Sequence, residues 1–246
     1  MRATSPTIDP GEIGRFAAQA ENWWDPEGSF RALHRINPAR LGFIRRHLTA
    51  HFHRDPSSLR PFDGLTLLDI GCGGGLVAEP MARLGFSVTG VDAGSEAIHV
   101  ARTHAEAMGL AIDFRVAAAE SVAEAGRQFD TVLALEVIEH VADPAKFFSA
   151  VGTLVRPGGI FIGATLNRTP RSFALAILGA EYIFRWLPPG THDWRKFLRP
   201  SEFVLGLRRN GLVATQLAGL VYDPRRAEWS VSPDLQVNYM VGAVRR

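Results

Sequence analysis

The sequence predicts an α/β protein in which a mostly parallel, seven-stranded sheet carries helices on both faces. From residue 65 onward, short apolar runs alternate with segments of helical spacing, which is the pattern of strand–helix–strand units. A glycine-rich turn follows the first of these apolar runs. Near the end of the chain, Leu212–Val221 and Gln236–Val244 are two further apolar runs that complete the sheet as a hairpin-like pair.

The first strand–turn–helix–strand unit carries the features of a nucleotide-type site. Leu65–Ile70 has the length and apolarity of a buried parallel strand, and residues 71–75 read Gly-Cys-Gly-Gly-Gly, a turn that lets the backbone approach a ligand closely. Ser87–Val91 is the next strand, and Asp92 at its carboxyl end can accept hydrogen bonds from both hydroxyls of a ribose. A nicotinamide dehydrogenase is disfavoured, because Leu76 occupies the third glycine position of its fingerprint.

Cap and turn signals place the other elements. A capping Asp, Asn or Ser, or a Pro, before an apolar-periodic segment marks where a helix begins. Short apolar runs bounded by glycine or charged residues mark the strands. By these signals helices begin at Asp9, Asn37, Ser95, Asp143 and Pro200, and further strands span Asp113–Ala118, Phe129–Leu135 and Ile160–Leu166.

Length and composition limit the classes of protein that fit. A chain of 246 residues suits one domain, with an N-terminal helical cap (1–60), a cofactor-binding core (61–166), an insertion (167–200) and a C-terminal helix and strands (201–246). The net charge of +2 is too small to indicate nucleic acid, although the pI is near 9.0. Cys72 is the only cysteine, which excludes an intrachain disulfide and suits a reducing compartment. We find no signal peptide and no membrane-spanning stretch.

Two pairs of side chains before residue 61 each have two interpretations. Trp23 and Trp24 either pack the N-terminal helix onto the core or cover an apolar substrate. Arg35 and Arg40 flank the expected helix start, where an arginine can clamp a carboxylate with two hydrogen bonds, or they are solvated surface residues.

Glu136, Glu139 and His140 follow the expected fourth strand at its carboxyl end, where ligands bind in open α/β sheets. On a helical turn these positions share a face, so the two carboxylates and the imidazole could hold a divalent cation. A phenol has a pKa of about 10, so transfer of a group to its oxygen needs help with the proton. A metal ion or His140 as general base could supply it. The alternative is that Glu139 caps the turn and His140 is structural.

Residues 168–199 form an insertion with an apolar centre and basic flanks. The apolar run is too short to span a bilayer, but its Arg, Lys and Trp flanks suit a segment that lies in a membrane interface. An ordinary lid packed over the active site is the alternative, and the two are compatible.

Several sequence blocks resemble one enzyme family. D-I-G-C-G-G-G at residues 69–75 resembles motif I of the class I S-adenosylmethionine-dependent methyltransferases. The blocks L-H-R-I-N-P-x-R, E-V-I-E-H-V-x-D-P, T-L-N-R and G-T-H-D-W, taken with it, resemble the O-methyltransferases of ubiquinone biosynthesis along nearly the whole chain. The resemblance implies a Rossmann-like class I methyltransferase fold and S-adenosylmethionine as cofactor. It also implies a catechol-type polyprenyl phenol or quinol substrate, methylated in two separate steps.

The resemblance also implies site residues and partners. The family's metal-binding residues match Glu136, Glu139 and His140, and magnesium is the metal that the resemblance implies. From the chemistry of these side chains, His140 and Glu136 are the expected catalytic residues. We expect residues 168–199 to contact the membrane surface, at the cytoplasmic side of the inner membrane. Contacts with other quinone-pathway enzymes are also expected, and contacts with nucleic acid are not. The family's cofactor contacts match Arg40, Gly71, Asp92 and Leu135. Asp69 and Gly73 of the glycine-rich motif, and Glu120 at the end of the third expected strand, are further expected cofactor-binding residues.

Two other functions remain open on the sequence. The first is a class I O-methyltransferase that acts on another small phenolic acceptor, which would share the whole cofactor site. The second is a non-enzymatic organiser of a biosynthetic complex that binds the cofactor only structurally.

Overall fold

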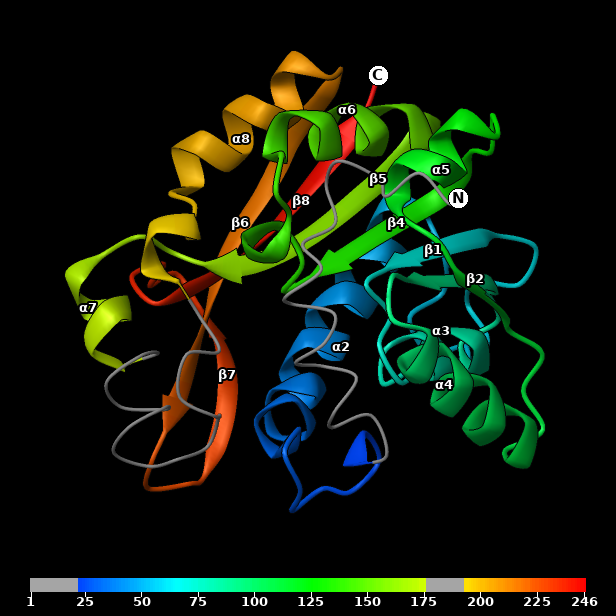
Figure 1. The fold of residues 1–246 in the computed structure, drawn as a ribbon, viewed down its shortest axis with the longest axis horizontal. Helices are drawn as coiled ribbons and strands as arrows, with labels where there is room; N and C mark the ends of the chain where they lie inside the picture. Colours follow the sequence, from blue (N-terminus) through cyan, green and yellow to red (C-terminus); the bar gives the residue numbers. More distant parts are fainter. Residues whose placement is uncertain (1–21, 176–192) are drawn as a thin grey trace.

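A computed structural model describes residues 22–175 and 193–246, in which a single sheet carries helices on both faces (Figure 1). The strand order is β3-β2-β1-β4-β5-β8-β6-β7. The sequence predicts seven strands, and the eighth is β7, which pairs antiparallel with β6 at the edge of the sheet. The strands are β1 (Thr66–Ile70), β2 (Ser87–Asp92), β3 (Asp113–Val116), β4 (Phe129–Leu135), β5 (Val155–Leu166), β6 (Leu212–Asp223), β7 (Glu228–Ser232) and β8 (Asn238–Arg245).

The five strands β1 to β5 are parallel, and β1 lies at the point where the strand order reverses. It pairs with β2 on one side and with β4 on the other, so that Asp69 lies opposite both Gly90 and Leu133. The chain runs outward from β1 to β3 and then returns to β4. In open α/β sheets, ligands bind in the crevice that such a reversal leaves at the carboxyl ends of the strands.

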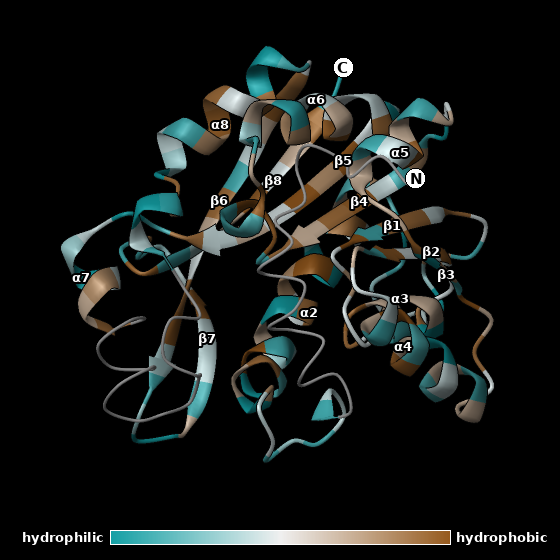
Figure 2. Ribbon diagram, in the orientation of Figure 1, coloured by the Kyte–Doolittle hydropathy of each residue, from teal (hydrophilic) through white to brown (hydrophobic). Residues whose placement is uncertain are grey.

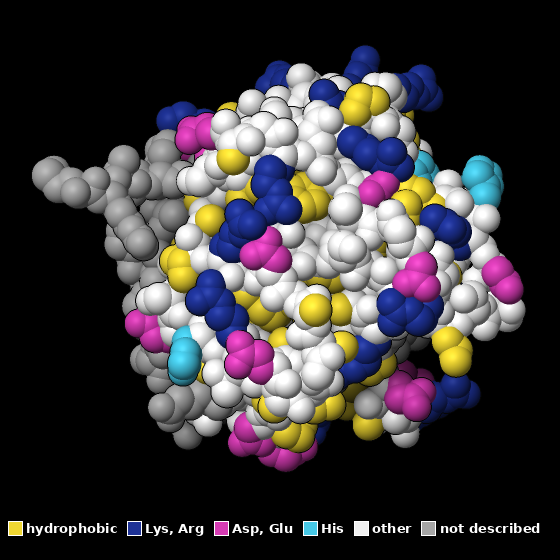
Figure 3. All heavy atoms as spheres, turned by 90° about the vertical axis from the view of Figure 1, so that its right-hand side faces the viewer, with side chains coloured by type: hydrophobic (Ala, Val, Ile, Leu, Met, Phe, Trp, Pro, Cys, Tyr) yellow, Lys and Arg dark blue, Asp and Glu magenta, His cyan; other side chains and the backbone are white. Residues whose placement is uncertain are grey.

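Two apolar layers, one on each face of the sheet, form the core. Successive residues of a strand point to opposite faces, so Leu67 of β1 packs in one layer and Leu68 in the other. The first layer includes residues of α2 (Arg31–His51), α3 (Ala78–Arg83) and α4 (Ser95–Ala107), and the second includes residues of α5 (Ala119–Glu124), α6 (Pro144–Leu154) and α8 (Pro200–Arg209). Figure 2 shows the apolar stretches of the central strands between these helices. In Figure 3, basic and acidic side chains are interspersed on the face that lies on the right in Figure 1.

The helices α4, α6 and α8 begin where the sequence places them, although Gly94 and not Ser95 is the cap residue of α4, and the start of α2 differs. Asp143 caps α6, since its side chain accepts hydrogen bonds from the backbone N–H groups of Ala145 and Lys146. The helix expected to start at Asn37 instead begins at Arg31 and contains Pro38. Asn37 is buried and its side-chain amide donates to the Leu76 carbonyl at 3.5 Å, so a tertiary contact replaces the expected cap.

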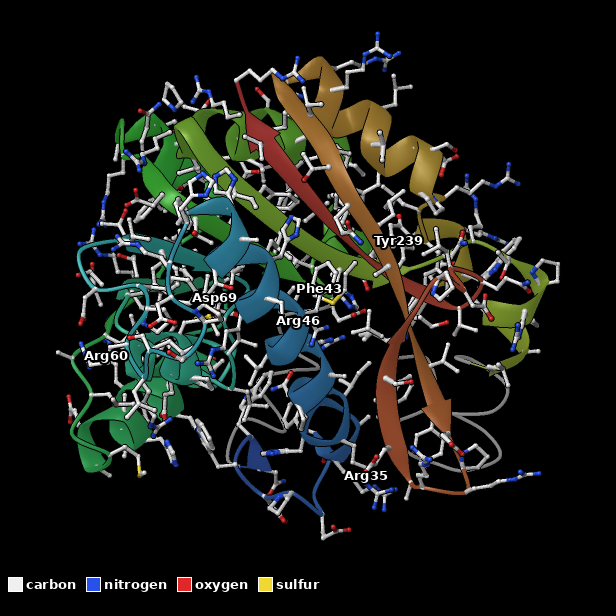
Figure 4. The ribbon with its side chains drawn as sticks, turned by 180° about the vertical axis from the view of Figure 1, so that it is seen from behind. Arg35, Phe43, Arg46, Arg60, Asp69 and Tyr239 are labelled. Atoms are coloured by element: carbon white, nitrogen blue, oxygen red, sulfur yellow. The ribbon has the colours of Figure 1, made fainter. Side chains whose placement is uncertain are left out.

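The two ends of the insertion pack against the sheet. α7 (Pro170–Ser172) is capped by Thr169, and η4 (Trp194–Lys196) donates the Trp194 indole N–H to the Thr169 carbonyl at 3.0 Å. Tyr239 of β8, labelled in Figure 4, is buried and donates its hydroxyl to the Leu198 carbonyl at 3.0 Å. The apolar centre of the insertion and the helix expected to begin at Asp9 lie outside the described residues. Among the described helices, none is long and apolar enough to cross a membrane.

Candidate active site

The glycine-rich turn lies at the carboxyl end of β1, beside the reversal of the strand order. Gly71 and Gly73 have φ angles of +68° and +51°, a region that favours glycine. A Cβ atom at Gly71 would lie 2.5 Å from Cγ2 of Val137, and one at Gly73 would lie 2.4 Å from Cη2 of Trp23. Glycine is therefore required at both positions by backbone conformation and by the neighbouring side chains.

Asp92 connects this turn to β2. Its Oδ2 accepts a hydrogen bond from the Gly73 backbone N–H at 3.0 Å, and its Oδ1 accepts one from Gly94 at 2.8 Å. Burial raises the pKa of Asp92, while these two N–H groups oppose the change. A carboxylate offers about four lone-pair sites, so Asp92 can still accept from the hydroxyls of a ribose.

Asp69, the last polar residue of β1, is buried beneath the turn (Figure 4). Its Oδ2 has no hydrogen-bond partner among the described residues. Burial, with a smaller contribution from the Asp92 charge, raises the pKa of Asp69 to about 7. A cationic group of a ligand placed beside this carboxyl would stabilise its charged form.

Of Arg35 and Arg40, only Arg40 lies in the site. It is 4% exposed on α2 and forms an ion pair with Glu136. Its Nε has no hydrogen-bond partner among the described residues. Arg35 instead lies near the outer end of α2 (Figure 4). It is exposed there, and its guanidinium lies 3.9 Å from the Glu27 carboxylate.

Glu136, Glu139 and His140 do not share a helical face. Glu136 has a φ of +56°, a conformation that costs free energy for a non-glycine residue, and its N–H donates to the Ala164 carbonyl at 2.9 Å. The helical turn begins only afterwards, as the 3₁₀ helix η2 (Ile138–His140). The left-handed residue turns the chain out of β4 before the helix starts. Glu136 is therefore not on the helical turn, although the sequence predicts that all three residues share one.

Glu139 and His140 lie in different environments on this turn. Glu139 is 2% exposed, and its Oε2 accepts a hydrogen bond from the Thr165 hydroxyl at 2.9 Å. Burial and the adjacent Glu136 raise the pKa of Glu139 well above its usual range. His140 is half-buried. It is therefore the more accessible of the two groups to a substrate.

The predicted metal ligands are not arranged as a metal site. Within residues 22–175 and 193–246, no three His, Cys, Asp or Glu side chains are placed to hold a metal ion. Glu136 is ion-paired with Arg40, and Glu139 is buried beside Thr165. As placed here, Glu136, Glu139 and His140 do not fit magnesium, and no step below depends on it.

The two remaining cofactor candidates lie at the carboxyl ends of β4 and β3, which β1 and β2 separate in the sheet. Leu135 is the last residue of β4, half-buried, and pairs with Ala164 of β5. Glu120 is the second residue of α5, shortly after β3, and is half-buried. With the glycine turn and Asp92, these residues follow the carboxyl edge of the sheet from β3 to β4.

Trp23 and Trp24 are part of the site, although the sequence leaves their role open. The Trp23 ring covers Gly73 and Gly74, and the Trp24 indole N–H donates to the Gly74 carbonyl at 3.0 Å. The two adjacent tryptophans stand out in the sequence. Their contact with a turn some fifty residues away cannot be predicted from the residues around them.

The comparisons with known proteins agree with this geometry. Residues 68–163 match the family described as "Methyltransferase domain". The fold is similar to that of magnesium protoporphyrin IX methyltransferase from Synechocystis PCC 6803 with bound SAH, at a TM-score of 0.65 and 18% identity over 96% of this chain and 94% of that one. Another structure of that enzyme, with bound SAM, gives a TM-score of 0.64 at 17% identity and covers 99% of this chain and 100% of that one. The sheet, the glycine turn and Asp92 define a class I S-adenosylmethionine-dependent methyltransferase.

Curated relatives identify the branch of this class. The chain is 53% identical to the ubiquinone biosynthesis O-methyltransferase of Paramagnetospirillum magneticum, over 97% of this chain and 96% of the relative. It is also 53% identical to the enzyme of that name from Ruegeria pomeroyi, over 100% and 99% of the two chains. The chain belongs to the family of ubiquinone biosynthesis O-methyltransferases, and S-adenosylmethionine is its cofactor.

Proposed function

We propose that this enzyme transfers a methyl group from S-adenosylmethionine to a phenolic oxygen of catechol-type polyprenyl intermediates, and that it serves both O-methylation steps of ubiquinone biosynthesis. The observation that carries the proposal is the likeness to enzymes of that name at 52–53% identity, with nearly the full length of both chains covered. The site at the carboxyl edge of the sheet supports it.

The residues of the site divide into cofactor binding and proton handling. Bound S-adenosylmethionine supplies an electrophilic methyl group on a sulfonium. The glycine turn and Asp92 form one side of its site, and the Arg40 guanidinium and the Asp69 carboxyl offer opposite charges to an amino acid head. The acceptor phenol must lose its proton as its oxygen attacks. His140 is the general base, because it is half-buried and open to a substrate, whereas Glu139 is 2% exposed.

Glu136 is the second catalytic candidate, and its role is electrostatic. Its ion pair with Arg40 holds a carboxylate and a guanidinium next to the turn that carries His140. A fixed carboxylate at this place stabilises the positive charge that develops during the proton transfer. Glu136 therefore supports the proton transfer without accepting the proton itself.

Replacing His140 tests this assignment. His140→Ala should lower kcat by about 10²-fold or more, the contribution typical of a general base, while the dissociation constant for the cofactor stays unchanged. His99→Ala, at an exposed position on α4, is the matched control and should leave both quantities unchanged. If His140→Ala keeps the wild-type kcat, His140 is not the base.

A chelator experiment accompanies this test. Because Glu136, Glu139 and His140 are not placed to hold a metal ion, EDTA should leave methyl transfer unchanged. Loss of activity in EDTA that magnesium restores would show that Glu136, Glu139 and His140 assemble as ligands in another arrangement.

We also propose that residues 168–199 contact the membrane surface, which would hold this enzyme peripherally at the cytoplasmic side of the inner membrane. Phe173 and Leu175, at the described edge of this segment, are large apolar side chains that are 41% and 50% exposed. Replacing both by Ala should reduce sedimentation with anionic liposomes, because apolar contact with the interface is lost. Leu59→Ala, at an apolar residue 86% exposed outside the segment, is the control. Equal sedimentation of wild type and double variant would contradict this contact.

A further inference from the structure

The Trp23 side chain lies flat against the cofactor-binding turn. Cβ atoms built at Gly73 and Gly74 would lie 2.4 Å from Cη2 and 2.5 Å from Cγ of Trp23, so the six-membered ring covers one glycine and the five-membered ring the other. The indole also stacks on Phe30, with ring centroids 3.7 Å apart and planes inclined by 8°. The beginning of the described chain, blue in Figure 1, is thus packed beside the turn that precedes α3.

Neighbouring contacts fix Trp23 in this place. The Trp23 carbonyl is 2.8 Å from Nε2 of His34, and the Trp24 indole N–H donates to the Gly74 carbonyl. Trp24 also stacks on His104, with centroids 3.5 Å apart and planes inclined by 7°. His104 in turn bonds to Glu79, a fully buried carboxylate of α3. Contacts from α3 and α4 therefore hold Trp24 beside the turn, while His34 of α2 and Phe30 hold Trp23 there.

The Trp23 indole N–H is buried but has no hydrogen-bond partner among the described residues. Trp23 as a whole is 8% exposed. A buried tryptophan usually finds a partner for its N–H, since an unmet buried donor costs free energy. The contacts that fix the ring leave its one polar atom without a partner, and this combination points to a ligand.

Two other buried polar atoms in this site share the same property. Nε of Arg40 is a donor without a partner, and Oδ2 of Asp69 is an acceptor without one, both within the described part of the chain. With the Trp23 N–H, the site offers two donors and one carboxyl group. An α-amino acid head, with its carboxylate and its ammonium, has the complementary set of groups.

We propose that Trp23 binds the cofactor directly: its indole N–H donates a hydrogen bond to the carboxylate of the methionine part of S-adenosylmethionine. Trp24 is a positioning residue, which holds Trp23 over the turn through Gly74 and His104. The proposal concerns the cofactor alone and is independent of the acceptor that the enzyme methylates.

Calorimetric titration of Trp23→Phe with two ligands tests this role. S-adenosylhomocysteine keeps the amino acid head, whereas methylthioadenosine lacks it. Phe keeps an aromatic ring over the glycines and removes the donor, so the dissociation constant for S-adenosylhomocysteine should rise about tenfold or more, and that for methylthioadenosine should stay within about twofold. Trp229→Phe, at a half-buried tryptophan on β7, is the matched control and should bind both ligands as the wild type does.

The positioning role of Trp24 has its own readout. Trp24→Phe should raise the KM for S-adenosylmethionine several-fold and leave kcat unchanged, because the turn that binds the cofactor is held less firmly while the reacting groups are untouched. A fall in kcat with an unchanged KM would contradict it.

Wild-type protein supports a second measurement that does not depend on the folding of a variant. The chain has five tryptophans, and their indole N–H signals are observable by ¹⁵N NMR. One of these signals should move downfield with S-adenosylhomocysteine and not with methylthioadenosine. Three results would overturn the proposal. Trp23→Phe could bind S-adenosylhomocysteine as tightly as the wild type does, or it could bind both ligands more weakly by the same factor. The third is that the indole signals of the wild type respond alike to both ligands.

Discussion

Replacing Asp69 by Asn should change how the stability of the ligand-free protein depends on pH. Burial and the neighbouring Asp92 raise the pKa of Asp69 to about 7, roughly 3 pH units above that of an ordinary aspartate. Between these two pKa values the folded protein holds a proton that the unfolded chain has lost. The free energy of unfolding therefore falls as pH rises through this window. At about 1.4 kcal/mol per pH unit, the total is about 4 kcal/mol.

Urea denaturation at pH 5, 6, 7 and 8 measures this effect. The stability of the wild type should decline relative to Asp69→Asn as pH rises to about 7, and the difference should then level off. The pKa values of Asp92 and Glu139 are also raised. Because the wild type and Asp69→Asn both contain these groups, most of their contribution to the pH dependence of stability cancels when the two proteins are compared. Asp63→Asn, at an exposed carboxyl, serves as the control. Parallel curves for wild type and Asp69→Asn across this range would refute the reasoning.

Three further substitutions test other parts of the site and fold. Asp92→Ala should weaken cofactor binding, because it removes the expected ribose acceptor and the acceptor of two backbone N–H groups; an unchanged calorimetric dissociation constant would contradict this. Gly71→Ala should destabilise the fold more than Gly64→Ala by about 1–3 kcal/mol, because both have positive φ but only at Gly71 would a Cβ meet Val137; equal urea midpoints would be inconsistent with this. Asp143→Ala should cost about 1 kcal/mol of stability by removing the cap of α6, with methyl transfer unchanged; a melting temperature equal to that of the wild type would rule out the cap.

The parts of the fold that depend on local signals could be predicted from the sequence. Apolar runs and glycine turns gave β1 and β2 with Asp92 at the end of the second strand, and Asp143-Pro144 gave the start of α6. The start of α2 could not be predicted in this way. Pro38 favours the first turn of a helix, but the buried contact of Asn37 with Leu76, far along the chain, overrides that preference.

The environment of the candidate active site was beyond local signals for the same reason. The ion pair of Arg40 with Glu136 and the hydrogen bond of Thr165 to Glu139 each join distant segments. The left-handed conformation of Glu136 then separates it from the helical turn, which spacing along the sequence cannot reveal. β7 was missed because its residues, E-W-S-V-S, are largely polar and exposed and do not form an apolar run.

Methyl transfer to a short-chain demethylubiquinol analogue tests the central claim most directly. Purified enzyme, S-adenosylmethionine and the analogue should yield a product that is heavier by one methylene unit and carries the new methyl group on a phenolic oxygen. The assay should include calorimetric binding of the cofactor to the same preparation. Product formation supports the proposed function. Intact cofactor binding without any methylated product would contradict it.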